Sequence, residues 1–454
     1  MFFLKRRRLV FWLIKAYFKK WRRSLFFSFV FGLIIFFILR FGVNYFIPLI
    51  PFTQKQTIGL VGSYSSDNIP TSILSKISDG LTSVSSSDQV VKPAAAKSWD
   101  IKDDGKTYIF YLKKNIYFTD GTLLTSDNVN YNFLDVTVEK PNKFTIIFKL
   151  KNKYSPFLVT VSKPIFKNGF VGIGKYKLQD INLNGNFIQS ISLVDAKGRS
   201  QEISYQFYPT EDALKSAYAL GDISKMIGIT NTSFNNKNFS DFKNSNISKI
   251  TDYSKLMTIF YNTRDKDLSD KRLREALSYA MPDTFIYGQR SYGSFPASSW
   301  VYANGSTTYV QDIVHAKSIV AQSSGSSPSS KLTIELKTLP QNENLAKEIK
   351  SYWGKIDVNT NIIVVNSFPQ SFQAFLGEFN IPKDPDQYTL WHSSQINNIT
   401  NYKNLRIDKL LEDGRQTFDI EQRRKIYSDF QKYFLDDSPA TFLYFPYEYT
   451  VTRK

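Results

Sequence analysis

The sequence predicts an α/β protein of two lobes with mixed β-sheets, preceded by one N-terminal transmembrane helix. The chain has 454 residues, and a single hydrophobic core stops growing near about 250–300 residues, so we expect at least two lobes. A strand–helix–strand pattern over residues 332–365 predicts parallel strands. Asp-Gly turns between alternating apolar runs near residue 105 predict antiparallel hairpins. An apolar run over residues 25–47 predicts the membrane helix.

The apolar run LFFSFVFGLIIFFILRFGVNYFI, residues 25–47, is long enough to cross a hydrocarbon core of about 30 Å. Its one charge, Arg40, lies late enough for the side chain to reach the outer interface. A cleavable signal peptide would have a shorter apolar region and a small-residue site, which residues 44–48 do not offer. We therefore expect a retained anchor, with residues 1–24 as a basic cytoplasmic tail.

The positive charge is concentrated before the anchor. The net charge is +18, but 11 basic residues and no acidic one precede Asp67, and the remaining 47 of the 58 basic residues exceed the 40 acidic ones by only 7. This distribution argues against nucleic-acid binding and for membrane orientation. The stretch 9–21 either lies on the inner membrane surface or is a disordered tail. Because cysteine is absent, neither a disulfide nor a lipoprotein anchor is available.

The most informative stretch is residues 90–133. Asp103–Lys106 forms a predicted turn ahead of the alternating strand TYIFYL, and Asp120-Gly121 forms a second turn. Thr125 or Ser126 is the predicted N-cap of a helix with Val129 and Phe133 on its apolar face.

This stretch closely resembles the signature of the family 5 extracellular solute-binding proteins of ABC importers. The residues in matching places are Pro93, Ala96, Ser98, Trp99, Asp103, Asp104, Gly105, Thr107, Tyr108, Phe110, Leu112, Phe118, Asp120, Gly121, Leu124, Thr125, Asp127 and Val129. Residues 172–178, 261–280, 401–411 and 421–434 resemble later family segments in the expected order. In the helix after residue 269, Ser269 is the predicted N-cap.

The resemblance implies a bilobal periplasmic-binding-protein-like fold of type II, cluster C. Lobe I would span residues 52–257, completed by about 431–454, and lobe II residues 258–430, with crossings near Met257–Tyr261 and near the C-terminus. The implied function is capture of peptides or similar small solutes outside the membrane for ABC permease subunits, by a monomer that closes around its ligand. The alternatives are a tethered receptor or sensor without a transport role and, third, a cell-wall-active enzyme.

Nothing in the sequence supports catalysis. A histidine-containing metal site or a Ser-His-Asp triad would have to use one of the two histidines, His315 and His392, and His315 is predicted to lie on a surface helix. The Ser-x-x-Lys match at Ser240 lacks the partner motif that penicillin-recognising enzymes need. We expect no enzyme activity, no cofactor and no metal site.

The ligand-binding residues are predicted from the resemblance. Asp384-Pro385-Asp386 resembles the family's Asp-Pro-Asp segment, but the preceding Trp-x-x-Asp pattern, which binds the ligand amine in peptide-binding members, is absent from residues 377–383. Either Asp384, Asp386 or Glu378 takes over, or the ligand lacks a free amine. Trp391 is a binding residue or a core residue. The predicted contacts are Tyr64, Ser65, Asp384, Asp386, Tyr388, Trp391 and His392.

Overall fold

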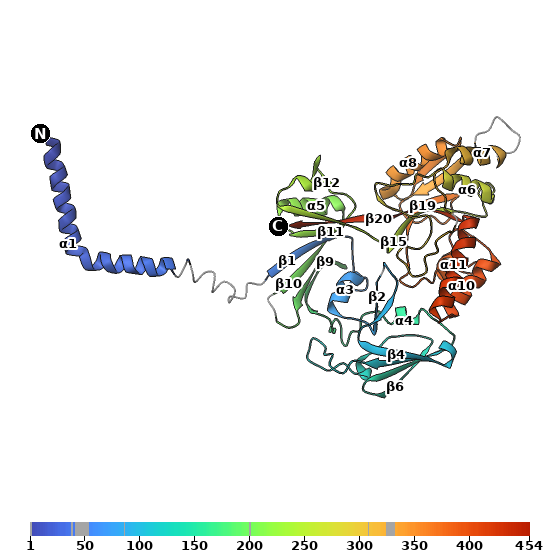
Figure 1. The fold of residues 1–454 in the computed structure, drawn as a ribbon, viewed down its shortest axis with the longest axis horizontal. Helices are drawn as coiled ribbons and strands as arrows, with labels where there is room; N and C mark the ends of the chain where they lie inside the picture. Colours follow the sequence, from blue (N-terminus) through green and yellow to red (C-terminus); the bar gives the residue numbers. More distant parts are fainter. Residues whose placement is uncertain are drawn as a thin grey trace. The chain divides into compact units, whose positions relative to one another are not determined.

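The structure is a computed structural model that describes residues 2–37, 40, 54–85, 87–198, 201–306, 308–323 and 332–454. It contains two compact units, Met1–Gln54 and Lys55–Lys454 (Figure 1). The second unit, called the body below, contains both lobes of the α/β fold.

The first unit is built on one helix, α1 (Phe2–Phe37). Large apolar side chains on its second half are exposed, Phe26 and Phe31 among them. No helix among the described residues is both long and apolar enough to cross a membrane. The predicted span 25–47 runs partly outside the described residues, at 38–39 and 41–47.

A mixed 12-stranded sheet runs through the body in the order β18-β17-β19-β15-β20-β11-β1-β10-β9-β8, with β14 and β16 also paired to β20. One half of it, with the sheet β4–β7, makes what we call lobe I. The strands of this half are β1 (Gln54–Val61), β8 (Tyr176–Asn184), β9 (Phe187–Asp195), β10 (Gln201–Tyr208), β11 (Lys225–Ile229) and β14 (Ser245–Thr251). Its helices are α3 (Thr71–Ile77), α4 (Phe157–Thr160) and α5 (Glu211–Leu220).

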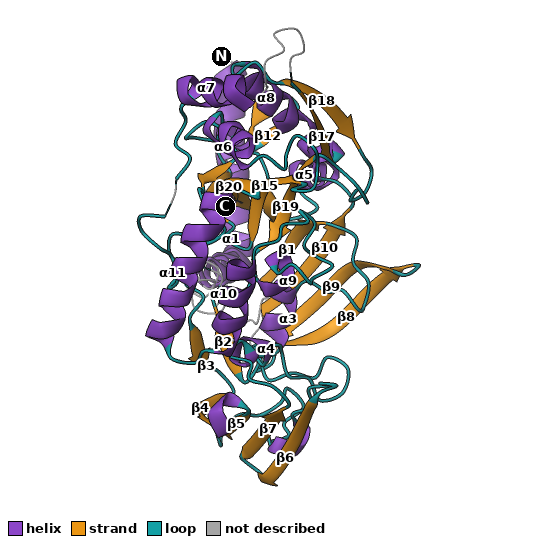
Figure 2. Cartoon of the chain, turned by 90° about the vertical axis from the view of Figure 1, so that its right-hand side faces the viewer, coloured by secondary structure: helices purple, strands orange, loops and turns teal. Residues whose placement is uncertain are grey.

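The other half of the sheet makes lobe II, with helices on both faces (Figures 1 and 2). Its strands are β15 (Lys255–Tyr261), β16 (Gly288–Arg290), β17 (Thr333–Thr338), β18 (Asn359–Val364) and β19 (Ala374–Asn380). One core contains residues of α6 (Lys271–Tyr279), α7 (Ile313–Ser323) and α8 (Glu343–Gly354). A second core contains residues of α9 (Tyr388–Trp391), α10 (Leu405–Gln416) and α11 (Ile420–Asp437).

One prediction for lobe II is confirmed and one is corrected. The pair β17 and β18 is parallel, as the strand–helix–strand pattern indicates. Asp419 is the N-cap of α11 and its carboxylate accepts the Gln422 amide at 2.8 Å. The N-cap of α6 is Asp270 rather than Ser269, because the Asp270 carboxylate accepts the Arg272 amide at 2.9 Å.

Lobe I carries a separate antiparallel sheet in the order β4-β5-β7-β6, at the opposite end of the body from α6–α8 (Figure 2). Its strands are β4 (Ala96–Lys102), β5 (Thr107–Leu112), β6 (Val136–Asn142) and β7 (Thr145–Leu150). The remaining strands form two short hairpins, β2 (Thr82–Val84) with β3 (Val91–Pro93), and β12 (Ser233–Phe234) with β13 (Lys237–Asn238).

The predicted turn between β4 and β5 is confirmed, and the helix predicted after Thr125 is wrong. Gly105 has φ +86° in the turn, a conformation that glycine adopts without strain. After Thr125 there is a single 3₁₀ turn, Ser126–Asn128, closed by a capping box. Val129 is already extended and its side chain is buried in the core beneath β5 and β7, so burial of that side chain replaces continuation of the helix.

The two lobes are joined by strands that cross between them. The chain passes from β14 to β15 through residues 252–254, and β20 (Ala440–Arg453) returns at the end. Residues 440–446 of β20 pair with β15 and β16, whereas residues 447–453 pair with β14 and β11. Crossings of this kind let two lobes move about a short hinge.

Candidate functional site

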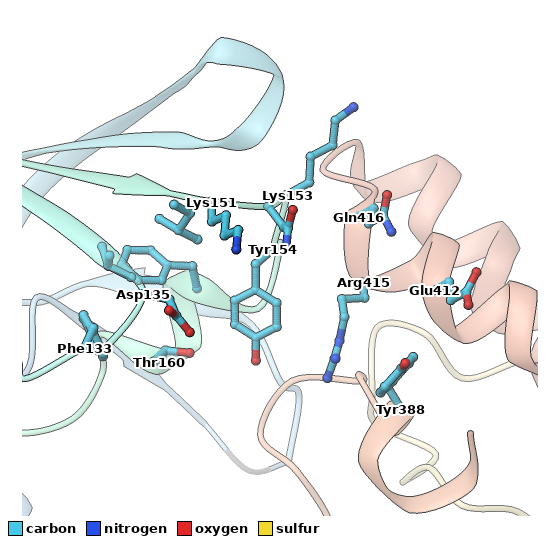
Figure 3. A pocket seen from close by; sticks show the side chains of 14 residues that line it. Phe133, Asp135, Lys151, Lys153, Tyr154, Thr160, Tyr388, Glu412, Arg415 and Gln416 are labelled. Atoms are coloured by element: carbon cyan, nitrogen blue, oxygen red, sulfur yellow. The ribbon is translucent and has the colours of Figure 1, made fainter. Parts of the chain in front are cut away.

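A cavity of about 770 Å³ lies between the lobes (Figure 3). This volume is in the range of small-molecule sites. Residues at the start of β6, at the end of β7 and in α4, with the loops beside them, make the lobe I side, and residues of α9 and α10 make the lobe II side. The lining residues are Phe133, Asp135, Val136, Leu150, Lys151, Asn152, Lys153, Tyr154, Phe157, Thr160, Tyr388, Glu412, Arg415 and Gln416. We call this cavity the groove.

Arg415 organises the lobe II wall of the groove. Its Nε and Nη2 atoms donate to the Asp386 carboxylate at 2.9 and 2.8 Å. Its guanidinium lies 4.1 Å from the ring centre of Tyr388 and 5.4 Å from that of Tyr154, which belongs to lobe I. Burial raises the pKa of Asp386, and the adjacent Arg415 opposes that rise. Arg415 therefore holds an ion pair in its own lobe while facing an aromatic ring of the other.

The lobe I wall carries charges of both signs. Lys151, Lys153 and Asp135 line it, and Glu412 lies opposite on α10 (Figure 3). Lys153 is paired with Asp104. Charged and aromatic groups that converge on one cavity suit a polar solute with apolar side chains.

Asp384 has its carboxylate occupied by Arg423. The Asp384 side chain is 9% exposed and that of Arg423 is 8%, and two guanidinium nitrogens contact its two oxygens, one at 3.0 Å. The Asp384 Oδ1 also accepts the Asp386 amide at 2.9 Å. Burial opposes the positive charge, but the adjacent carboxylate raises the pKa of Arg423 above its ordinary value.

Trp391 lies in the second core of lobe II. It is 2% exposed, its ring centre lies 4.7 Å from that of Phe434, and its Nε1 donates to the Gln387 side chain at 3.0 Å. The structure favours the core alternative that the sequence left open for this residue.

Tyr388 and His392 stack on each other beside the groove. Their ring centres are 4.2 Å apart. His392 Nδ1 lies 2.8 Å from the Ser394 hydroxyl and Nε2 lies 3.4 Å from the carboxylate of Glu412, which lines the groove. Tyr388 thus lines the groove, whereas His392 does not line it and packs against the Tyr388 ring.

Tyr64 and Ser65 lie after β1 in lobe I. The Tyr64 ring centre is 5.0 Å from that of Phe207 and its hydroxyl donates to the Val61 carbonyl at 3.2 Å. The Ser65 carbonyl accepts the Asn68 amide at 3.0 Å. Among the described residues, no hydrogen bond, ion pair or ring contact joins these two residues to Asp384–His392. Their role as ligand contacts stays a prediction.

Of the three acids that could replace the missing aspartate, Glu378 has a different environment. Asp384 and Asp386 are each bound by an arginine, whereas Glu378 lies on β19 opposite Met257 and is exposed to solvent. Surrounding protein raises the pKa of Glu378, and nearby Lys255 opposes that rise.

Sequence patterns did not indicate the lining residues Lys151, Tyr154 and Arg415. Arg415 lies just after residues 401–411, which resemble the family's C-terminal third, but no local motif distinguishes it from other surface arginines. A pairing of Asp386 with a basic residue 29 positions later has no signal in a single sequence.

Two lobes joined by crossing strands, with a charged groove between them, are the architecture of a binding protein that closes around a small solute. The sequence matches the bacterial extracellular solute-binding proteins, family 5 Middle, over residues 90–400. The chain belongs to this family.

Curated and structural relatives agree with that membership. The oligopeptide-binding protein AppA of Bacillus subtilis (strain 168) is 24% identical over 467 residues, covering 84% of this chain and 83% of AppA. The ABC transporter substrate-binding protein CtaP of Listeria monocytogenes has a TM-score of 0.73 at 22% identity, covering 88% of this chain and 94% of CtaP. NikZ of Campylobacter jejuni, solved with Ni(L-His), has a TM-score of 0.71 at 21% identity over the same shares. The structural matches establish the bilobal periplasmic-binding-protein fold.

Proposed function

We propose that the chain captures peptides or similar small solutes outside the membrane and delivers them to an ABC importer. The groove between the lobes carries this proposal, because both lobes contribute charged and aromatic side chains to one cavity of about 770 Å³. Membership of the family and the peptide-binding name of the relative AppA support the ligand class. With this function we propose a division close to the predicted bounds of 52–257 with 431–454 and 258–430, but with the return to lobe I inside β20, because α11 packs in the second core of lobe II beyond residue 430.

The mechanism is closure of the lobes about the strand crossings. A solute that contacts Tyr154 of lobe I and Tyr388 of lobe II binds the closed form more tightly than the open one. That difference in affinity shifts the population toward closure. The closed form then docks on the permease as a monomer. A receptor that signals without transport uses the same closure, and it differs in having no dependence on a permease and an ATPase.

We also propose that the N-terminal segment anchors the chain in the cell membrane. The basic residues of α1, including Lys19, Lys20, Arg22 and Arg23, precede the apolar residues from Phe26 to Phe37. This order favours a cytoplasmic N-terminus, with residues 1–24 inside, an anchor over 25–47 and the body outside. Extraction with sodium carbonate should leave the full chain in the membrane pellet and release a chain that begins at Lys55.

Thermal unfolding of the full chain in detergent, with and without defined solutes, tests the ligand class. A peptide present at about 100 times its Kd adds about 2.7 kcal/mol to the free energy of unfolding, which raises Tm. Tyr388→Ala should weaken that shift, whereas Tyr302→Ala, outside the groove lining, is the matched control. Mass spectrometry of solute co-purified with the chain identifies the ligand. No shift with peptides of any length, and no co-purified solute, would contradict the proposal.

A further inference from the structure

The turn between α10 and α11 reaches out of lobe II and into lobe I. Ile407 and Leu411 of α10 and Tyr427 of α11 belong to the second core of lobe II. Phe418, in the turn between these helices, instead packs against the core of the β4–β7 sheet in lobe I. Its ring centre lies 6.2 Å from that of Tyr108 on β5. One side chain of lobe II therefore completes a core of lobe I.

The Phe418 ring occupies the space beside the Cα atom of Gly105, where another residue would have its Cβ atom. A Cβ atom built on Gly105 would lie 1.9 Å from Cε2 of the Phe418 ring, far inside contact distance. Glycine at this position of the β4–β5 turn is therefore needed twice, for its φ of +86° and for the space that the ring occupies.

The end of α10, just before this turn, is also hydrogen-bonded across the lobes. The Ser155 amide donates to the Arg415 carbonyl at 2.8 Å, and the Ser155 hydroxyl donates to the Gly414 carbonyl at 3.2 Å. Ser155 follows Tyr154 in lobe I, and Arg415 precedes Phe418 by three residues in lobe II. These bonds tie together the backbones that carry Tyr154 and Arg415, the two side chains that meet across the groove.

We propose that Phe418 is a positioning residue, whose docking on Gly105 and Tyr108 brings the two walls of the groove together and so sets solute affinity without contact with the solute. The inference rests on the proposed function, because it assigns the groove as the solute site. Phe418 is outside the groove lining. Because the Phe418 ring is only partly buried, the apolar area that docking removes from water corresponds to about a 10-fold gain in affinity for a solute that needs the closed form.

A pair of glycine variants separates docking from backbone strain. Gly105 and Gly121 have φ of +86° and +85°, but a Cβ on Gly121 meets no heavy atom within 4 Å. Gly105→Ala and Gly121→Ala therefore strain the backbone alike, and only the first displaces the Phe418 ring. With a tryptic digest of casein as the solute probe, we expect Gly105→Ala to bind at least about 10-fold more weakly than Gly121→Ala.

The ring itself is tested by substitution of Phe418. Phe418→Ala should weaken binding like Gly105→Ala, and Phe418→Leu should restore part of the loss. In the Phe418→Ala background, Gly105→Ala and Gly121→Ala should bind alike, because no ring is left to displace. The proposal would be overturned if, in the Phe418→Ala background, Gly105→Ala still bound solute more weakly than Gly121→Ala. Wild-type solute affinity in the single variant Phe418→Ala would also overturn it.

The distance between the lobes gives a readout that does not depend on affinity. Because the chain has no cysteine, spin labels can be placed at Lys97→Cys in lobe I and Leu405→Cys in lobe II, both exposed. Pulsed dipolar spectroscopy should show a short-distance population that the digest increases and that Phe418→Ala removes. An unchanged distance distribution in Phe418→Ala would refute the docking role. A short population that depends on Phe418 but not on the digest would instead contradict the proposed function.

Discussion

Replacing Asp384 by asparagine should destabilise the body severely, because it leaves the buried Arg423 without its counter-ion. Both side chains are less than a tenth exposed, at 9% and 8%. Breaking a buried pair by removing one partner costs about 3–5 kcal/mol, since the remaining charge is desolvated and unpaired. Against a typical free energy of unfolding of about 5–15 kcal/mol, that loss is a large share of the total.

The assay is equilibrium unfolding in urea, followed by tryptophan fluorescence. Trp391 lies in the second core of lobe II, the same core that contains Tyr427, a hydrogen-bond partner of Arg423. Asp180→Asn is the matched control, because Asp180 is exposed on β8, and a surface change of this kind costs within about 0.5 kcal/mol. The double variant Asp384→Asn/Arg423→Gln should recover part of the loss, since no buried charge is left unpaired.

Two results would refute this reasoning. The first is a free energy of unfolding for Asp384→Asn that equals that of the Asp180→Asn control. The second is strict additivity, within about 0.5 kcal/mol, of the two single variants in the double variant. Unaltered stability together with lost solute binding would instead assign Asp384 to ligand recognition, which is one of the alternatives that the missing Trp-x-x-Asp pattern leaves open.

Two further predictions concern a tyrosine and a tryptophan. The hydrogen bond to Glu348 raises the pKa of Tyr287 to about 12 from 10.0. Between these two values the folded chain keeps a proton that the unfolded chain loses. The contribution of Tyr287 to the free energy of unfolding is therefore fully present below pH 10 and is lost as the pH rises towards 12. Tyr287→Phe should flatten the alkaline fall of Tm relative to Tyr302→Phe, and equal slopes would contradict the cause. Trp391→Phe should cost about 1–3 kcal/mol in urea unfolding, because the buried Gln387 oxygen loses its donor. Solute affinity measured by calorimetry should stay at the wild-type value, and selective loss of affinity would place Trp391 in the site.

Local signals in the sequence predicted much of the secondary structure. The alternation in TYIFYL and the Asp-Asp-Gly turn specify β4, β5 and their hairpin, because turn geometry and side-chain period depend on neighbouring residues only. The helix predicted after Thr125 was wrong for a non-local reason. Thr125 does cap a turn, but Val129 is taken into the core beneath β5 and β7, and the chain extends to reach it.

The candidate site was only partly predictable. The Asp-Pro-Asp motif directed attention to Asp384 and Asp386, and the structure binds Asp386 to the groove-lining Arg415 but Asp384 to the buried Arg423. Their partners, Arg423 and Arg415, lie 39 and 29 positions later on two helices, and no pattern in a single sequence connects residues so far apart. The resemblance therefore located the segment without distinguishing a carboxylate held by a buried arginine from one that is open to a ligand.

The sequence by itself determined the family, the α/β class and the local turns, since these depend on the order and spacing of neighbouring residues. The tertiary structure alone decided that Trp391 is core, that Arg415 faces Tyr154 across the groove and that Phe418 occupies the space left by Gly105. Each of these depends on which surfaces the fold brings together. Gly121, which is required for its turn only, and Gly105, which also leaves room for a ring of the other lobe, look identical in the sequence. The ring that fills the space beside Gly105 belongs to a residue more than 300 positions away.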